Sequence, residues 1–353
     1  MTFQPDYRHM LEVMANRRPA RLPLYEHIIS PGVMEKILGV SFAAEHQSDD
    51  ASDLGRFFSH FCRFYARMTY DTVSYEVCII PQMPDHGAIL GGRPGPIQSR
   101  SDLDRYPWEE IPERFWRHAS PRFEALAAAL PPGMKAVGGV GNGVLEIAED
   151  LVGFEWLCAM LYEEPELAAD LFVRIGDLMT AIWERFLERH AGAFAVCRFG
   201  DDLGFKTGTL ISPAAIRDHI IPQYRRVIGL IRGRGYPFLW HSCGCIFAVM
   251  DDVIALGINA KHSNEDIIAP YEDWIRRYGE RIGLVGGIDV DILCQHRPDE
   301  VFEIVRERGR RYRSLARGYA LGSGNSIPDY VPVEGYLAMI RAAQALRAED
   351  ARS

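Results

Sequence analysis

The chain has 353 residues, of which 48% are hydrophobic and 25% are charged, as is usual for a globular protein. Its net charge of -9 argues against a nucleic-acid-binding protein, because that class needs a basic surface. No run approaches ~20 uninterrupted apolar residues, and the charged N-terminal segment lacks the apolar stretch of a secretion signal, so we expect a cytoplasmic protein without a membrane span.

Short β-rich segments alternate with longer helical patterns along the chain, which indicates a parallel sheet built from βα units. Eight segments have the composition of strands, and in chain order they span residues 22–27, 72–78, 135–140, 194–199, 237–241, 258–262, 282–286 and 319–322. Eight parallel strands close a (β/α)8 barrel. The sequence therefore predicts a (β/α)8 TIM barrel, and residues 1–353 are expected to form one domain.

The segments between these strands also carry signals. Residues 1–70 are expected to hold helical additions around the first strand. The proline-rich residues 81–134 are expected to form a long loop region with one or two helices, inserted at the rim of the barrel. Apolar residues at helical spacing predict helices near 154–160 and 165–190, and Ser212 has the residue type of an N-cap. An open doubly wound sheet is the alternative, but the glycine-rich residues 138–143 do not match its dinucleotide-binding fingerprint.

Each predicted strand ends in polar or glycine-rich residues, and the C-terminal ends of barrel strands are where barrel enzymes keep their sites. The candidate catalytic residues at these ends are Glu76, Asp201, Asp202, His262 and Asp289. The candidate substrate-binding residues are His27, Tyr75, Trp240, Ser323 and Asn325, and Phe205 and Tyr330 are further aromatic candidates for a pocket wall. We therefore expect the site in the mouth of the barrel.

The strongest chemical signal is the segment WHSCG at residues 240–244. Residues i and i+2 of a strand point to the same face, so His241 and Cys243 are expected to project together into the mouth. Imidazole and thiolate are usual zinc ligands, which makes these two residues candidate metal ligands. The seven cysteines of the chain are odd in number and scattered in spacing, which indicates reduced thiols.

A zinc site needs more ligands than these two, and the best candidates follow other strands. They are Glu76, Asp202 and His262, each of a type that binds zinc. His262 could instead serve as a hydrogen-bonding residue of its turn. Asp201 or Asp202 could orient a ligand, take a proton or cap the following loop. Cys294 is more typical of a core thiol on a helix.

The segment LWHSCGCI, residues 239–246, resembles the zinc-dependent methyltransferase branch of the uroporphyrinogen decarboxylase superfamily. FGDDLG at residues 199–204, followed by Ser212-Pro213, is similar to the strand and helix that precede this motif in the superfamily. GGID at 286–289 is similar to its next-to-last strand end, and residues 332–339 to its closing helix. The resemblance is collinear over roughly residues 150–345.

This resemblance implies a methyltransferase that moves a methyl group between a small methylated substrate and a corrinoid protein or thiol acceptor. It implies zinc as Lewis acid at His241 and Cys243 and pairing into a homodimer. The corrinoid would come from a separate protein, since the chain has no DxHxxG cobalamin motif. Two departures stand out: the RQAGRY-type arginine segment is absent from residues 16–23, and Ser323 stands where we expect a further zinc-binding cysteine.

Two other functions stay open on the residues alone. One is a decarboxylase or other lyase without metal, in which Asp201 or Glu76 protonates or positions the substrate. That function gains support if Arg17, Arg18 and Arg21 line the mouth. The other is a barrel that binds a small molecule or a corrinoid protein without turnover, which the missing family cysteine favours.

Overall fold

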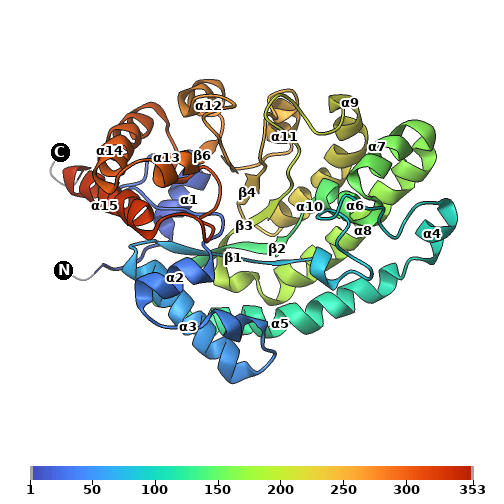
Figure 1. Cartoon of the computed structure of the whole chain (residues 1–353), viewed down its shortest axis with the longest axis horizontal. Helices are drawn as coiled ribbons and strands as arrows, with labels where there is room; N and C mark the ends of the chain where they lie inside the picture. Colours follow the sequence, from blue (N-terminus) through green and yellow to red (C-terminus); the bar gives the residue numbers. More distant parts are fainter. Residues whose placement is uncertain (1–2, 351–353) are drawn as a thin grey trace.

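One parallel sheet of seven strands forms the centre of the protein in the computed structural model, which describes residues 3–350 (Figure 1). Its strands pair in chain order and are β1 (Thr72–Cys78), β2 (Lys135–Gly141), β3 (Phe194–Gly200), β4 (Phe238–His241), β5 (Ala260–His262), β6 (Gly283–Ile288) and β7 (Tyr319–Ser323). The sheet curls into a TIM-barrel-like α/β fold, which confirms the predicted fold class. Seven of the predicted strands are present, with ends that shift by at most two residues.

Helices surround the sheet (Figure 1). The α-helices are α1 (Arg8–Met14), α2 (Pro31–Leu38), α3 (Ala51–Arg67), α4 (Arg100–Arg105), α5 (Ile111–Ala129), α6 (Val144–Val152), α7 (Phe154–Glu163), α8 (Pro165–Arg189), α9 (Pro213–Ala215), α10 (Ile221–Gly233), α11 (Met250–Ala255), α12 (Tyr271–Tyr278), α13 (Val290–Gln295), α14 (Pro298–Leu315) and α15 (Val333–Asp350). The short 3-10 or π turns are η1 (Ala43–Gln47), η2 (Ile80–Gln82), η3 (Trp108–Glu110), η4 (Ala191–Ala193) and η5 (Ile216–Ile220). Within residues 3–350, no helix combines the length and apolar composition that a membrane span requires.

The predicted first strand, residues 22–27, differs from the expectation. It forms a backbone hydrogen bond to β7, in which Tyr25 N donates to the Leu321 carbonyl at 2.9 Å. No backbone hydrogen bond joins it to β1 in the described part of the chain. Instead, Ser74 Oγ of β1 donates to the His27 carbonyl at 2.5 Å. Residues 22–27 are therefore not a full strand. Side-chain hydrogen bonds close the barrel between these residues and β1, and we call this boundary the seam.

The amino end of the barrel is filled by apolar side chains and covered by α1. Met10, Val13 and Met14 of α1 are buried there. The strand residues in this cluster are Val137, Ala195, Val196, Leu239, Ala260, Val285 and Ala320. Since this end is packed, the carboxyl ends of the strands are the place left for a site.

A second, larger apolar cluster lies between the sheet and the outer helices. The helix pairs α3–α5, α8–α10 and α14–α15 pack side by side around the sheet. The expected N-terminal helices are α1, α2 and α3. The region expected as a rim insertion, residues 81–134, contains α5, which packs on α3 as an outer helix of the barrel. Ser212 accepts a hydrogen bond from Ala215 N, as an N-cap does.

Candidate metal centre

His241 and Cys243 lie at the carboxyl end of β4. His241 is the last residue of the strand and is buried, and its Nε2 lies 3.5 Å from Sγ of Cys243. Gly244 follows with a φ of +84°, a conformation that glycine adopts without strain. A side chain at Gly244 would also collide with the backbone of Gly204. The turn after β4 therefore needs glycine, and it brings the imidazole and the thiol together.

Asp202 completes a group of three potential ligands. Its Oδ1 lies 3.7 Å from Nε2 of His241 and accepts a hydrogen bond from the backbone N–H of Cys243 at 2.8 Å. One ligand atom from each of the three residues lies within 4.8 Å of the others. Around a tetrahedral zinc ion with ordinary bond lengths, neighbouring nitrogen, oxygen and sulfur ligands are about 3.4–3.6 Å apart. The three side chains thus fit zinc in donor chemistry and in spacing.

A second group of potential ligands, His27, His241 and His262, shares one residue with the first. The Nδ1 atoms of His241 and His262 lie 2.8 Å apart, a hydrogen-bond distance that is shorter than the spacing of two zinc ligands. The other nitrogen of His262, Nε2, binds the Ser323 carbonyl at 3.0 Å. His27 stacks on His241 with ring centroids 3.7 Å apart. His262 and His27 therefore support His241, and His262 has no free lone pair for a metal.

Burial sets the charge of the centre. It lowers the pKa of His241 well below the usual value and that of His262 to about 3, so both imidazoles are neutral at pH 7. Burial also raises the pKa of the Cys243 thiol to about 12, and the nearby carboxylate of Asp202 adds to this shift. A metal-bound thiol, in contrast, is deprotonated outright. The metal-free chain thus holds a neutral thiol and two neutral rings.

Glu76, another expected ligand, forms an ion pair with Arg198 of β3. Nη2 of Arg198 lies 2.6 Å from Oε2 of Glu76, and these side chains are 0% and 9% exposed. Arg198 also donates to the Tyr25 hydroxyl and to Ser74 Oγ. Because the guanidinium already balances its charge, Glu76 does not complete the metal site, which corrects that expectation. The sequence did carry a signal for Arg198, a lone arginine within the apolar strand FAVCRFG.

Asp201 caps a helix and does not face the centre. Its two oxygens accept hydrogen bonds from Leu145 N and Glu146 N, each at 2.9 Å, in the first turn of α6. The Tyr224 hydroxyl donates to it at 2.6 Å. Gly143 lies against the Asp201 side chain, and any larger residue there would collide with it. The expected catalytic role of Asp201 is therefore corrected: the residue caps α6, which precedes it in the chain, and not the loop that follows it.

Tyr75 and Trp240 lie on the outer face of the sheet, because alternate residues of a strand point to opposite sides. Tyr75 packs edge-on against Phe58 of α3, and its hydroxyl lies 3.0 Å from Nε2 of His46. Trp240 is fully buried beside Tyr224 of α10. Both expectations of substrate binding are wrong, since these side chains belong to the core between sheet and helices.

Ser323 and Asn325, both expected to bind substrate, lie in different surroundings at the end of the last strand. The Ser323 hydroxyl hydrogen-bonds the buried Glu26 carboxyl, and Ser323 N donates to Glu26 Oε1 at 2.9 Å. Burial raises the pKa of Glu26 to about 8, so this carboxyl is mostly protonated at pH 7. Asn325 instead faces the centre, with Nδ2 3.4 Å from Sγ of Cys243. Position 325, rather than 323, stands beside the thiol.

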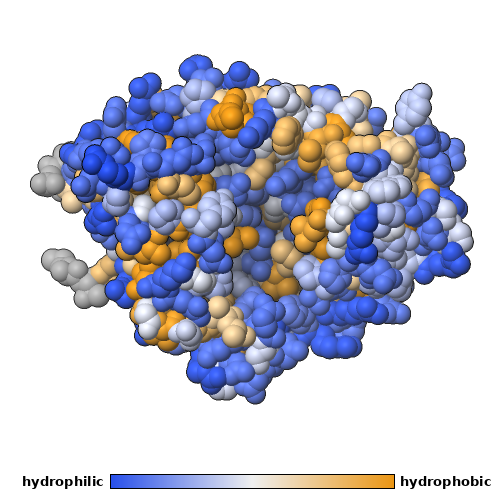
Figure 2. Space-filling view, viewed as in Figure 1, coloured by the Kyte–Doolittle hydropathy of each residue, from blue (hydrophilic) through white to orange (hydrophobic). Residues whose placement is uncertain are grey.

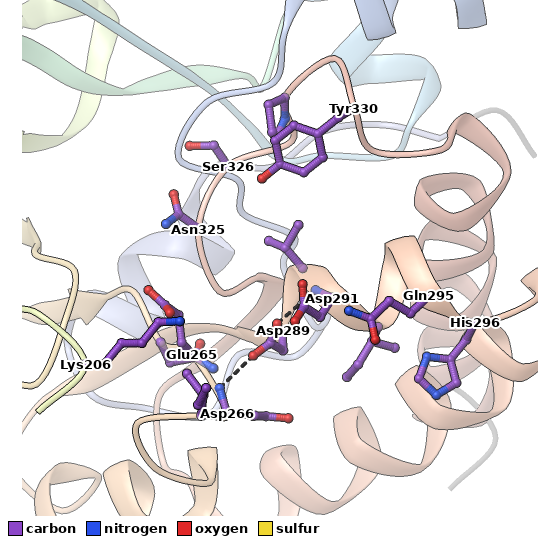
Figure 3. Close-up of a pocket in the computed structure, with 15 residues that line it drawn as sticks. Lys206, Glu265, Asp266, Asp289, Asp291, Gln295, His296, Asn325, Ser326 and Tyr330 are labelled. Atoms are coloured by element: carbon purple, nitrogen blue, oxygen red, sulfur yellow. Dashed lines mark hydrogen bonds between the residues drawn. The ribbon is translucent and has the colours of Figure 1, made fainter. Parts of the chain in front are cut away.

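A pocket of about 510 Å³ adjoins the centre at Asn325 (Figure 3). Its walls come from the segments after β3, β5, β6 and β7, and the lining residues are Lys206, Asn264, Glu265, Asp266, Ile267, Asp289, Val290, Asp291, Ile292, Gln295, His296, Asn325, Ser326, Pro328 and Tyr330. Asp289 shapes this wall, because it accepts hydrogen bonds from Asp266 N at 2.6 Å and Asp291 N at 2.9 Å. Figure 2 shows a surface hollow near the centre of the view, with hydrophobic residues among polar ones around it.

The three N-terminal arginines lie away from the mouth. Arg17 pairs with Glu12 of α1 at 2.7 Å, beneath the amino end of the barrel. Arg21 pairs with Asp71, which immediately precedes β1. Arg18, the residue after Arg17, is exposed to solvent. The arrangement that would have supported a lyase is therefore not found.

The fold and the site together define an α/β barrel protein with a candidate centre at the carboxyl ends of its strands. Residues 93–346, more than two-thirds of the chain, match the uroporphyrinogen decarboxylase (URO-D) family. The chain belongs to this family, which confirms the expected resemblance.

Two known proteins show the range of this similarity. A uroporphyrinogen decarboxylase from Streptomyces coelicolor is 25% identical over 263 residues, which are 70% of this chain and 68% of that protein. A solved structure described as a methyltransferase from Methanosarcina mazei superposes with a TM-score of 0.72 at 15% identity, covering 96% of this chain and 97% of that one. At such identity the second comparison shows that the folds agree.

Proposed function

We propose that this protein is a methyltransferase that moves a methyl group between a small methylated substrate and a corrinoid protein or thiol acceptor. The observation that carries the proposal is the zinc-compatible group of Asp202, His241 and Cys243 at the mouth of the barrel. The methyltransferase with a similar fold supports the same class of reaction.

Zinc supplies Lewis-acid chemistry, which stabilises charge on a leaving heteroatom or keeps a bound thiol deprotonated. Asp202, His241 and Cys243 would hold the ion through one oxygen, one nitrogen and one sulfur atom. Ser263 Oγ at 3.3 Å and Asn325 Nδ2 at 3.4 Å both donate to Sγ of Cys243. These donors stabilise a thiolate and orient it toward the other two ligands.

The adjoining pocket is assigned to the small substrate, since its volume of about 510 Å³ is typical of ligand sites. Asn264 lines it and is buried, and its Oδ1 accepts a hydrogen bond from Gly287 N at 3.0 Å. This contact fixes the amide, whose Nδ2 has no hydrogen-bond partner among the described residues. Since Asn264 joins the segment after β5 to the end of β6, we assign it to shaping the wall of the substrate pocket.

The rim of the mouth is assigned to the corrinoid carried by a separate protein. Phe205, Ile267 and Tyr330 are 62%, 69% and 72% exposed. Ile267 and Tyr330 line the pocket, and Phe205 immediately precedes the lining residue Lys206. Apolar side chains exposed together mark contact surfaces, and the face of a corrin ring is largely apolar.

Metal analysis and a transfer assay test the proposed function. The purified protein should contain stoichiometric zinc and should consume methylcobalamin in the presence of 2-mercaptoethanol, followed by the change in cobalamin absorbance. Removal of the metal with a chelator should stop the reaction, and added zinc should restore it. A protein without zinc, or one that keeps full activity after chelation, would contradict the proposal.

A metal-independent lyase is the second candidate, favoured by the similarity to a uroporphyrinogen decarboxylase. The same chelated protein can be incubated with uroporphyrinogen and the loss of carboxyl groups followed. Decarboxylation by metal-free protein would favour this candidate over methyl transfer.

A further inference from the structure

His262 and Ser323 stand behind His241 in a chain of hydrogen bonds that leads away from the centre. The Ser323 carbonyl lies 3.0 Å from Nε2 of His262, and Nδ1 of His262 lies 2.8 Å from Nδ1 of His241. All three residues are at most 4% exposed, so water does not compete for these atoms.

The direction of each hydrogen bond follows from the atoms involved. A carbonyl oxygen only accepts, so Nε2 of His262 carries a proton. Burial favours the neutral form of an imidazole, which has a single N–H, so Nδ1 of His262 has a lone pair and accepts. The donor in the second bond is then Nδ1 of His241. This leaves a lone pair on Nε2 of His241, the atom that faces Cys243 and Asp202.

We propose that His262 is a positioning residue that fixes the tautomer of His241, so that the Nε2 lone pair of His241 is held ready for the metal. The role of His262 in metal binding rests on the proposed zinc centre, whereas the tautomer of His241 is a property of the metal-free protein. A histidine ligand whose other nitrogen is engaged in this way binds metal in a fixed orientation.

Glu26 and His27 hold this series of hydrogen-bonded residues in place, but neither determines the tautomer of His241. The Glu26 carboxyl binds both Ser323 N and the Ser323 hydroxyl, which keeps the Ser323 backbone fixed behind His262. His27 stacks on His241 at an interplanar angle of 14°, which restrains the ring plane. Nδ1 of His27 has no hydrogen-bond partner in the described part of the chain. His27→Phe is therefore a matched control, since it keeps a stacking ring.

Nitrogen-15 NMR of the metal-free, histidine-labelled protein tests the tautomer directly, because two-bond nitrogen–proton couplings distinguish the two neutral forms. His241, assigned by the signals lost in His241→Ala, should be in the Nδ1–H form in the wild type and in His27→Phe. His262→Phe should give a mixture of both forms. His262→Asn places an amide oxygen near the position of Nδ1 and should restore the Nδ1–H form. A His241 that carries its proton on Nε2 in the wild type overturns the proposal, as does an unchanged tautomer in His262→Phe.

Cobalt(II) binding provides a second readout that does not depend on methyl transfer. His262→Phe should weaken cobalt(II) affinity about 10–100-fold, as is typical when a ligand loses its supporting hydrogen bond, whereas His27→Phe should bind as the wild type does. A wild-type protein with the expected tautomer and bound cobalt but no methyl transfer contradicts only the proposed function. Methyl transfer by a protein with the other tautomer contradicts only the role of His262.

Discussion

Cys243 contributes the only sulfur atom of the proposed ligand group. Its replacement by serine should abolish zinc binding and lower methyl transfer by more than about 100-fold, since even supporting residues of metal sites cost 10–100-fold when removed. Zinc content and the methylcobalamin assay measure both effects. Cys158→Ser is the control, because Cys158 is an exposed cysteine on α7. Full zinc content in Cys243→Ser would count against the assigned ligand.

The adjacent carboxylates Asp201 and Asp202 should separate stability from metal binding. Asp201→Ala leaves the N–H groups of Leu145 and Glu146 and the Tyr224 hydroxyl without an acceptor, and should lower the free energy of unfolding by about 1–3 kcal/mol. Asp202→Ala should weaken zinc binding and change stability little, because its side chain is 46% exposed. Urea unfolding and zinc titration distinguish the two. The reverse pattern would exchange their assigned roles.

Single residues were predictable from the sequence where residue type and strand period were enough. His241 and Cys243 were found because an i, i+2 pair at a strand end shares a face. The expectation for Trp240 was wrong because the two-residue alternation along a strand shows which side chains share a face. It does not show which face meets the barrel interior. Arg198 and Glu26 were missed as functional partners, since a buried charge is explained only by neighbours distant in sequence.

At the scale of elements, the buried pair of Arg198 and Glu76 ties β3 to β1. Arg198→Met leaves a carboxylate buried without its partner, and should lower the free energy of unfolding by about 3–5 kcal/mol. The double variant Arg198→Met with Glu76→Gln should lose less free energy of unfolding than Arg198→Met alone, because no isolated charge remains buried. Urea unfolding of both single variants and the double variant measures the coupling. Strictly additive losses would show that the two groups do not interact.

Most strands could be predicted because parallel barrel strands are short apolar runs that end in polar residues. The segment 22–27 has the same composition, yet its backbone bonds β7 only, and a sequence pattern does not report whether both neighbours are within reach. The prolines of residues 81–134 predict a loop region with one or two helices at the rim, whereas α5 of this region packs on α3 as an outer helix. Pro121 within α5 shows that one of these prolines is tolerated inside a helix.

For the whole molecule, Glu26 should make stability depend on pH. Folding raises its pKa from 4.5 to about 8, mainly through burial, so the folded state prefers the protonated acid. The resulting stability is fully present below about pH 4.5 and is lost as the pH rises to about 8. Glu26→Gln mimics the neutral acid and should be more stable than the wild type at pH 8 by a few kcal/mol. Urea unfolding from pH 5 to 8 tests this, and parallel profiles for both proteins would refute it.

Family membership explains the barrel and the position of its mouth, whereas the substrate depends on side chains that vary on a common fold. From the sequence, the pocket residues Asn264 and Asn325 could be identified only as polar residues that follow strands. Their contacts with Gly287 and Cys243 required the folded chain.

The seam between residues 22–27 and β1 has a mechanical consequence. Paired strands are joined by many equivalent backbone hydrogen bonds. Across the seam, the hydrogen bonds come from a few side chains such as Ser74 and Arg198. We therefore expect the seam to open more easily than the rest of the ring, and amide exchange should be faster there than in the paired strands. Because His27 ends the segment and stacks on His241, each excursion of the seam would tilt the imidazole of the centre while the rest of the barrel stays closed.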